Sequence, residues 1–65
     1  MKINTPYIKL DSFLKAVNAA SSGGEAKFVI MEGKVLVNGE TELRRGRKLY
    51  PGDRMKVGGK EYMVE

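Results

Sequence analysis

The chain has 65 residues, with twelve Lys or Arg, eight Asp or Glu and no Cys or His, which gives a formal net charge of +4. This length allows one small domain, and the missing Cys and His exclude disulfides, a thiol nucleophile and the commonest metal ligand and general base. Because so few side chains titrate near neutral pH, we expect neither an enzyme nor a cofactor or metal site. Because no signal segment and no apolar run of about 18 residues is found, we expect a soluble, cytoplasmic, monomeric protein with no membrane contact.

The first element expected is a helix that begins near Leu10. Apolar residues recur at the spacing of one helical face, at Leu10, Phe13, Leu14 and Val17. Asp11 suits the positive N-terminal end of a helix, and the "SSGG" stretch at residues 21–24 is expected to end it.

A second helix is expected to follow Ser22. Glu25 stands three residues after Ser22, the spacing of a capping box, and Gly33 stands where a left-handed C-terminal cap would fall. Gly23 and Gly24 weaken the first turn. This start of the helix has two readings: Ser22 and Glu25 only cap the helix, or free backbone N–H groups bind an anion. The stretch lacks the glycine, lysine and hydroxyl spacing of the phosphate loop in nucleotide hydrolases, so that motif is excluded.

Beyond Gly33 the apolar period changes to two, which predicts a first hairpin around Asn38-Gly39. A two-residue loop would place the buried-type Val35 and Val37 on one face with Glu40 and Glu42. That pairing disfavours a buried face, so we expect a longer loop or a bulge after Gly39.

A second hairpin is predicted after a tight turn at "YPGD", residues 50–53. A loop at Gly58-Gly59 places four apolar residues on one face, namely Met55, Val57, Tyr62 and Val64. It places four charged residues on the other, namely Arg54, Lys56, Glu61 and Glu65. The expected fold is therefore α+β, with two N-terminal helices packed on a small antiparallel β-sheet.

The net charge is concentrated near "RRGRK", residues 44–48. Residues 1–43 carry five basic and five acidic residues, whereas residues 44–65 carry seven and three. Charge runs are usually solvated turns, but guanidinium groups suit bidentate phosphate recognition, Gly46 allows a close approach or a sharp bend, and no acid lies between Glu42 and Asp53. The run is either a solvated hairpin end or a polyanion site, and Tyr50 beside it either packs on the Pro51 turn or stacks on a base.

The stretches "KLDSFLK", "SGGEAKFVIMEGKVLVNGE" and "RRGRKLYPGD" resemble the αL-motif RNA-binding domain of small-subunit ribosomal protein S-four. The resemblance covers almost the whole chain and is strongest to short stand-alone, YaaA/YbcJ-like members. The family has a basic residue before Leu-Asp, a Ser-Arg-x-x-Ala-Arg helix start and a Gly-x-Val-x-Val-Asn-Gly strand. This chain departs from it at Gly23, where the family has arginine. Either RNA binding is weakened there, or a bare backbone approaches a phosphate.

The resemblance implies a single RNA-binding domain, residues 1–65, in which both helix N-termini and the sheet loops face structured RNA, most readily ribosomal RNA or a ribosomal particle. Contacts are expected mainly to phosphate and shape. The candidate RNA-binding residues are Lys9, Gly23, Gly24, Lys27, Lys34, Asn38, Arg44, Arg45, Arg47 and Lys48.

The sequence leaves two other functions as alternatives to RNA binding. One is a protein-interaction or ribosome-assembly factor that docks on a protein partner. The other is a β-grasp carrier, which needs a C-terminal Gly-Gly, whereas Gly58-Gly59 is followed by six more residues.

Overall fold

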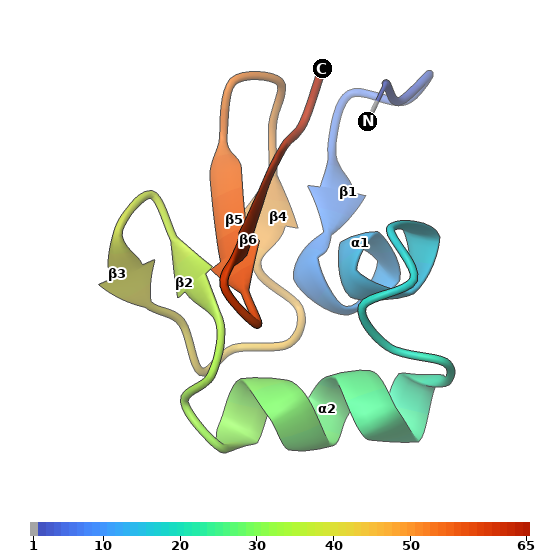
Figure 1. Ribbon diagram of the computed structural model, residues 1–65. Helices are drawn as coiled ribbons and strands as arrows, with labels where there is room; N and C mark the ends of the chain where they lie inside the picture. The colour runs from blue at the N-terminus through green and yellow to red at the C-terminus, as the bar shows by residue number, and fades with distance from the viewer. Residues whose placement is uncertain (1) are drawn as a thin grey trace.

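The computed structural model describes residues 2–65 and has the expected α+β architecture (Figure 1). The elements in chain order are β1 (Ile8–Lys9), α1 (Leu10–Ala16), α2 (Gly23–Met31), β2 (Leu36–Val37), β3 (Glu40–Thr41), β4 (Lys48–Leu49), β5 (Arg54–Val57) and β6 (Lys60–Met63). Helix α2 runs across one end of the molecule, with α1 and the strands on the same side of it (Figure 1).

The strands form two antiparallel sheets. Four strands pair in the order β3-β2-β5-β6, and β1 pairs separately with β4. The second sheet was not predicted, because each of its strands has only two residues and the two lie far apart in the sequence. It joins the segment before α1 to the segment after residues 44–47.

The core is shared by both helices and both sheets. Its buried apolar residues are Leu10, Phe13, Leu14, Ala20, Ala26, Ile30, Val35, Val37, Leu49, Met55 and Val64. Helix α1 thus begins at Leu10 and buries three of the four residues of the predicted face, while Val17 lies just beyond its end and is partly buried. The helix ends at Ala16, before the predicted "SSGG" stop, because Asn18 takes the left-handed conformation with φ 62°.

Helix α2 has the predicted cap at each end. The Glu25 N–H donates to Ser22 Oγ at 3.1 Å, but the Glu25 carboxylate accepts the N–H of Ser21, at 2.6 Å, in place of that of Ser22. Gly33, with φ 76°, ends the helix in a Schellman motif, since its N–H donates to Ile30 O.

The first hairpin has the two-residue loop, and our prediction of a longer loop or bulge is wrong. Asn38 and Gly39 have φ angles of 52° and 86°, as a type I′ turn requires, and Val37 lies opposite Glu40. The register continues, because the Glu42 N–H donates to Val35 O at 3.0 Å. Glu42 therefore shares the face of the buried valines and is itself only 6% exposed.

The second hairpin and its turn are as predicted. The Asp53 N–H donates to Tyr50 O at 2.9 Å, and Gly52 has φ 100°. Met55 lies opposite Tyr62, so the apolar residues face the core and the charged residues face solvent.

No helix among residues 2–65 is long and apolar enough to cross a membrane.

Candidate nucleic-acid interface

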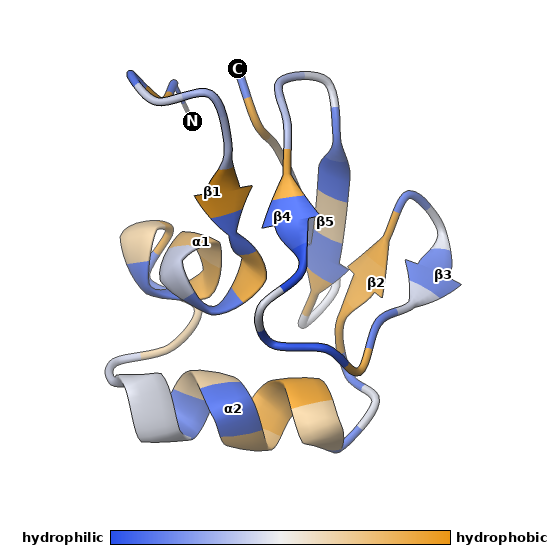
Figure 2. Ribbon diagram, turned by 180° about the vertical axis from the view of Figure 1, so that it is seen from behind, coloured by the Kyte–Doolittle hydropathy of each residue, from blue (hydrophilic) through white to orange (hydrophobic). Residues whose placement is uncertain are grey.

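The basic loop, defined here as residues 44–48, is fastened to the start of α1 by main-chain hydrogen bonds. The N–H of Leu10 donates to Arg47 O at 2.8 Å, and the N–H of Asp11 donates to Arg45 O at 3.1 Å. Figure 2 shows the segment between β3 and β4 as a hydrophilic band that passes between the start of α1 and strand β2, alongside α2. The loop is therefore held in place by the fold and is not a free hairpin end.

This attachment limits what the N-terminus of α1 can offer a ligand, while the expectation that both helix N-termini face RNA stays a prediction. Besides the two N–H groups that reach the loop, the N–H of Ser12 donates to Asp11 Oδ1 at 2.8 Å. The first donors of α1 are thus satisfied within the protein and do not form an anion site. What this end of α1 offers a ligand is the exposed side chain of Lys9.

Glu42 lies beneath the basic loop and binds two of its arginines. Its Oε2 accepts the N–H and the Nε–H of Arg44, both at 3.0 Å, and its Oε1 accepts Nη2 of Arg44 at 3.1 Å and Nη1 of Arg47 at 2.8 Å. The Glu42 side chain is 8% exposed, whereas that of Arg44 is 75% exposed. We name this group of three residues the Glu42 cluster.

The Glu42 cluster explains how a carboxylate is tolerated on a buried face. Hydrogen bonds from the Arg44 side chain, together with those from its backbone N–H and from Arg47, outweigh the effect of burial and lower the pKa of Glu42 to about 2. The carboxylate in turn raises the pKa of Arg44. Sequence reasoning that the loop has no acid to neutralise it was wrong, because Glu42 folds back against Arg44 and Arg47.

Three further cations, in the β1–β4 pair and the basic loop, lack a carboxylate partner in the described chain. Lys9 lies directly opposite Lys48 in the β1–β4 pair, and Arg45 is in the adjoining loop. Within residues 2–65 none of these three side chains takes part in an ion pair. Like charges placed opposite one another destabilise a sheet, so this arrangement favours a bound anion.

The aromatic neighbours of the loop form a small cluster. The Nζ of Lys48 lies 4.9 Å from the ring centroid of Tyr7, and the Tyr7 and Tyr50 rings are 5.8 Å apart at a tilt of 49°. Tyr50 is 49% exposed. The Tyr50 ring therefore packs against Tyr7, while about half of its surface stays open.

The start of α2 keeps two open backbone donors. Ser22 caps the N–H of Glu25, but the N–H groups of Gly23 and Gly24 donate no hydrogen bond within the described chain. A Cβ at Gly23 would meet nothing within 4 Å. The exposed Lys27 also belongs to this helix.

Lys34 and Asn38 flank strand β2, and their surroundings differ. Lys34 is exposed and forms no ion pair with any residue from 2 to 65. Asn38 Nδ2 donates to Asp53 Oδ1 at 3.1 Å, and its Oδ1 accepts the Arg54 N–H at 2.9 Å. The Asn38 amide therefore ties the first hairpin to the turn before β5, and an RNA contact by Asn38 stays a prediction.

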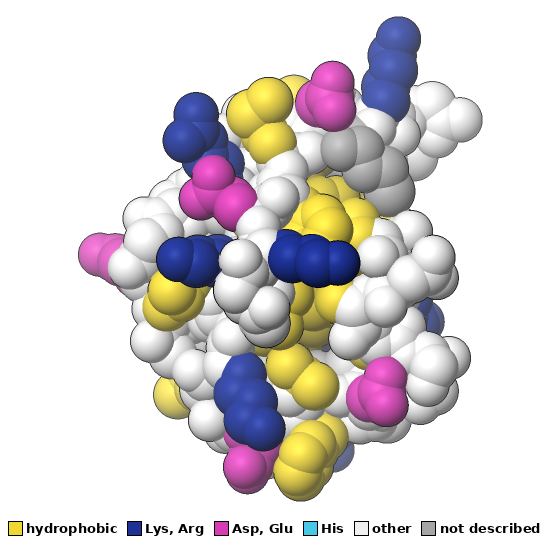
Figure 3. Space-filling view, viewed as in Figure 1, with side chains coloured by type: hydrophobic (Ala, Val, Ile, Leu, Met, Phe, Trp, Pro, Cys, Tyr) yellow, Lys and Arg dark blue, Asp and Glu magenta, His cyan; other side chains and the backbone are white. Residues whose placement is uncertain are grey.

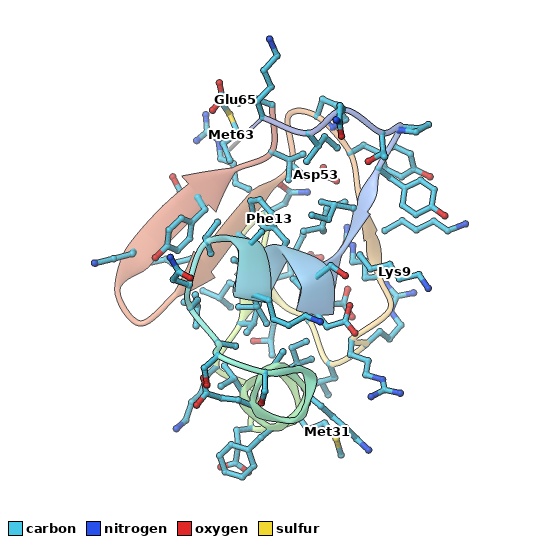
Figure 4. The ribbon with its side chains drawn as sticks, turned by 90° about the vertical axis from the view of Figure 1, so that its right-hand side faces the viewer. Lys9, Phe13, Met31, Asp53, Met63 and Glu65 are labelled. Carbon is cyan, nitrogen blue, oxygen red and sulfur yellow. The ribbon has the colours of Figure 1, made fainter. Side chains whose placement is uncertain are left out.

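The side of the molecule seen in Figure 1 carries charges of both signs. Figure 3 shows Lys and Arg interspersed there with Asp and Glu around an apolar area. In Figure 4, seen from the side, Lys9 points outward while Phe13 lies in the interior. Residues 2–65 form neither a pocket nor a group of three metal-ligating side chains, so the candidate interface is an open surface.

Glu42 is the site residue that sequence reasoning missed. The signal was present in the strand alternation, which put Glu42 on the face of Val35 and Val37. A carboxylate at an inward position two residues before an arginine needs a cationic partner, and Arg44 is within reach. We expected a bulge instead, and so moved Glu42 away from the core.

The sequence of the chain is similar to a known family and to two named relatives. A family model described as "S4 domain" matches residues 1–65. The chain is 48% identical over 59 residues to "Probable ribosome maturation protein RlbA" of Bacillus subtilis (strain 168), covering 91% of this chain and 83% of that protein. It is 34% identical over 59 residues to "Putative RNA-binding protein YbcJ" of Escherichia coli (strain K12), covering 91% and 84%.

The fold also matches an experimental structure. The solution structure of YbcJ from E. coli, described as revealing an αL motif involved in RNA binding, superposes with a TM-score of 0.73 at 31% identity. The match covers 98% of this chain and 82% of YbcJ.

Proposed function

The chain belongs to the S4 domain family, and from this premise we propose that it binds structured RNA, with ribosomal RNA or a ribosomal particle as its target. The membership confirms the resemblance to small stand-alone αL-motif proteins. The names of the two relatives, one a ribosome maturation protein and one an RNA-binding protein, support the proposal. In it the chain is a monomeric cytoplasmic domain without catalytic activity.

One observation carries the proposal: Lys9, Arg45 and Lys48 lie together without a carboxylate partner in the described chain. Folding brings Lys9 opposite Lys48 at a cost in charge repulsion. A polyanion relieves that repulsion and releases its own counterions on binding.

The proposed contacts address the RNA backbone. Lys9, Arg45 and Lys48 bind phosphates as cations, while the unused guanidinium N–H groups of Arg44 and Arg47 donate to phosphate oxygens. Because side chains do not enter the narrow major groove of A-form RNA, recognition is by phosphate position and shape, with weak sequence preference.

Helix α2 extends the proposed surface beyond the loop. Lys27 and Lys34 supply exposed cations, and the open N–H groups of Gly23 and Gly24 donate to a phosphate. Gly23 stands where the family has an arginine. We therefore favour a bare backbone that approaches the RNA over a weakened site.

A second candidate is an assembly factor that docks on a protein. It is favoured by Phe28 and Met31, which lie three residues apart on α2 and are 60% and 63% exposed. Capture of a protein partner that survives nuclease treatment would support it, whereas capture that is lost with the RNA supports RNA binding.

The test is a titration of the protein with a structured ribosomal RNA fragment over a range of salt concentrations. We expect the logarithm of the binding constant to fall linearly with the logarithm of salt, and the quadruple variant R44A/R45A/R47A/K48A to reduce the slope by about one ion for each cation removed. Binding that is independent of salt, or unchanged in the quadruple variant, would contradict the proposal.

A further inference from the structure

The carboxylate of Glu42 is a negative charge inside a site that is proposed to bind a polyanion. It is hydrogen-bonded to Arg44 and Arg47, two of the three arginines of the basic loop, at 2.8–3.1 Å. Judged by charge alone, it repels RNA and offsets part of the attraction of the loop. Judged by geometry, it fixes the side chains that meet the RNA.

The hydrogen bonds of the Glu42 cluster favour the geometric role. Each carboxylate oxygen accepts two donors, so both oxygens are covered by hydrogen-bond partners. A guanidinium has five N–H donors. Two of these donors in Arg44 and one in Arg47 bind Glu42, so three and four are not used by it. The side chain of Arg44 is 75% exposed and that of Arg47 is 29% exposed.

The cluster also constrains the path of the loop. The backbone N–H of Arg44 is bonded to the same Glu42 oxygen as its Nε–H, so main chain and side chain are fixed together. Arg47 meets Glu42 through its side chain and α1 through its carbonyl oxygen, which receives the Leu10 N–H. Glu42 and α1 thus hold the loop from two sides.

We propose that Glu42 is a positioning residue for RNA binding, which holds Arg44 and Arg47 in the arrangement that receives phosphates. The inference rests on the proposed function and specifies how its site is built. A long arginine side chain that is already ordered loses less conformational freedom on binding, so its affinity is higher. Loss of Glu42 therefore weakens RNA binding, although it raises the net charge of the protein from +4 to +5.

The central experiment compares Glu42→Gln with Glu40→Gln in the same RNA titration. Both variants remove one negative charge from the first hairpin, but Glu40 is exposed and lies outside the cluster. The glutamine amide at position 42 would point N–H groups at the arginine donors and break half of the cluster. We expect Glu42→Gln to weaken binding about tenfold and Glu40→Gln to leave it unchanged or slightly tighter.

A second variant separates charge from position. Glu42→Asp keeps the negative charge but is one methylene shorter, so it does not reach both arginines. The positioning role predicts weaker binding than wild type, whereas a purely electrostatic role predicts no change. This variant also serves if Glu42→Gln does not fold, as judged by its melting curve.

A spectroscopic readout tests the geometry without RNA. The Nε–H of Arg44 is bonded to a covered carboxylate oxygen, so its NMR signal should exchange slowly with water in wild type and in Glu40→Gln. It should exchange fast in Glu42→Gln. The proposal is overturned if folded Glu42→Gln keeps the slow signal, or if it binds RNA as tightly as wild type or more tightly. Failure of the wild-type protein to bind RNA would instead refute the proposed function, and the inference with it.

Discussion

Two stretches carry much of the positive charge, the basic loop and the β5–β6 hairpin, and the fold holds their side chains differently. In the hairpin, Arg54 Nη1 lies 4.0 Å from Glu61 Oε1, and both side chains are more than half exposed. In the loop, Arg44 and Arg47 bind a buried carboxylate at 2.8–3.1 Å. A count of charges does not show how these side chains are held. The two stretches differ because Arg44 and Arg47 of the loop are held in place before a ligand binds, whereas Arg54 of the hairpin is not.

The largest expected effect concerns the cations that have no carboxylate partner. The triple variant K9A/R45A/K48A should weaken RNA binding about 100-fold, since three phosphate contacts are lost. The matched variant R54A/K56A/K60A removes three charges from the hairpin and should weaken binding only a few-fold, through the general field. Titrations at one salt concentration measure both. Equal losses would remove the distinction between loop and hairpin.

The next effect is on stability at acid pH. The folded pKa of Glu42, about 2, lies below the ordinary value of 4.5, so its stabilisation is present above pH 4.5 and is lost as the pH falls toward 2. The contribution is about 1–2 kcal/mol, less than the full pKa shift implies, because the covering arginine is itself in water. Urea unfolding of wild type and Glu42→Gln across this range measures it. Glu61→Gln, the hairpin control, should keep the wild-type dependence.

A glycine matters for stability in the hairpin loop but not in the basic loop. Gly59, in the hairpin loop, has φ 80°, so Gly59→Ala should destabilise the fold by about 1 kcal/mol. Gly46 lacks a left-handed φ, and a Cβ there would meet nothing within 4 Å, so Gly46→Ala should leave the melting temperature unchanged or raise it slightly. If RNA approaches the bare backbone of the loop, Gly46→Ala weakens binding several-fold. A variant with unchanged affinity would place the RNA backbone farther from Gly46.

The smallest effect is expected for the ion pair of the hairpin. Arg54→Ala should change the free energy of unfolding by less than about 0.5 kcal/mol, because the pair with Glu61 is long and solvent-screened. Its measurement in urea sets the scale against which loss of Glu42 is judged. A destabilisation comparable to that of Glu42→Gln would mean that the two pairs do not differ as their geometry indicates.

Features governed by neighbouring residues were predictable from the sequence. The periodic face of α1, the Ser22 cap, the Gly33 terminus and the Gly58-Gly59 hairpin all follow from spacing within a few residues. The end of α1 was missed because Asn18 adopts a left-handed conformation, which asparagine tolerates but does not require. For the candidate site, the sequence indicated which cations take part, through the charge run at residues 44–48 and the resemblance of the chain to a known family.

By itself, the sequence determined the α+β elements and the place of the positive charge, because helix periods, caps and turns are local properties of the chain. Only the tertiary structure decided which charges are free. It placed Lys9 opposite Lys48, used the first N–H groups of α1 to hold the loop, and brought Glu42 beneath Arg44 and Arg47. The physical reason is that the partners of buried polar groups are chosen by contacts across the fold, since nearly all such groups are hydrogen-bonded in the folded state.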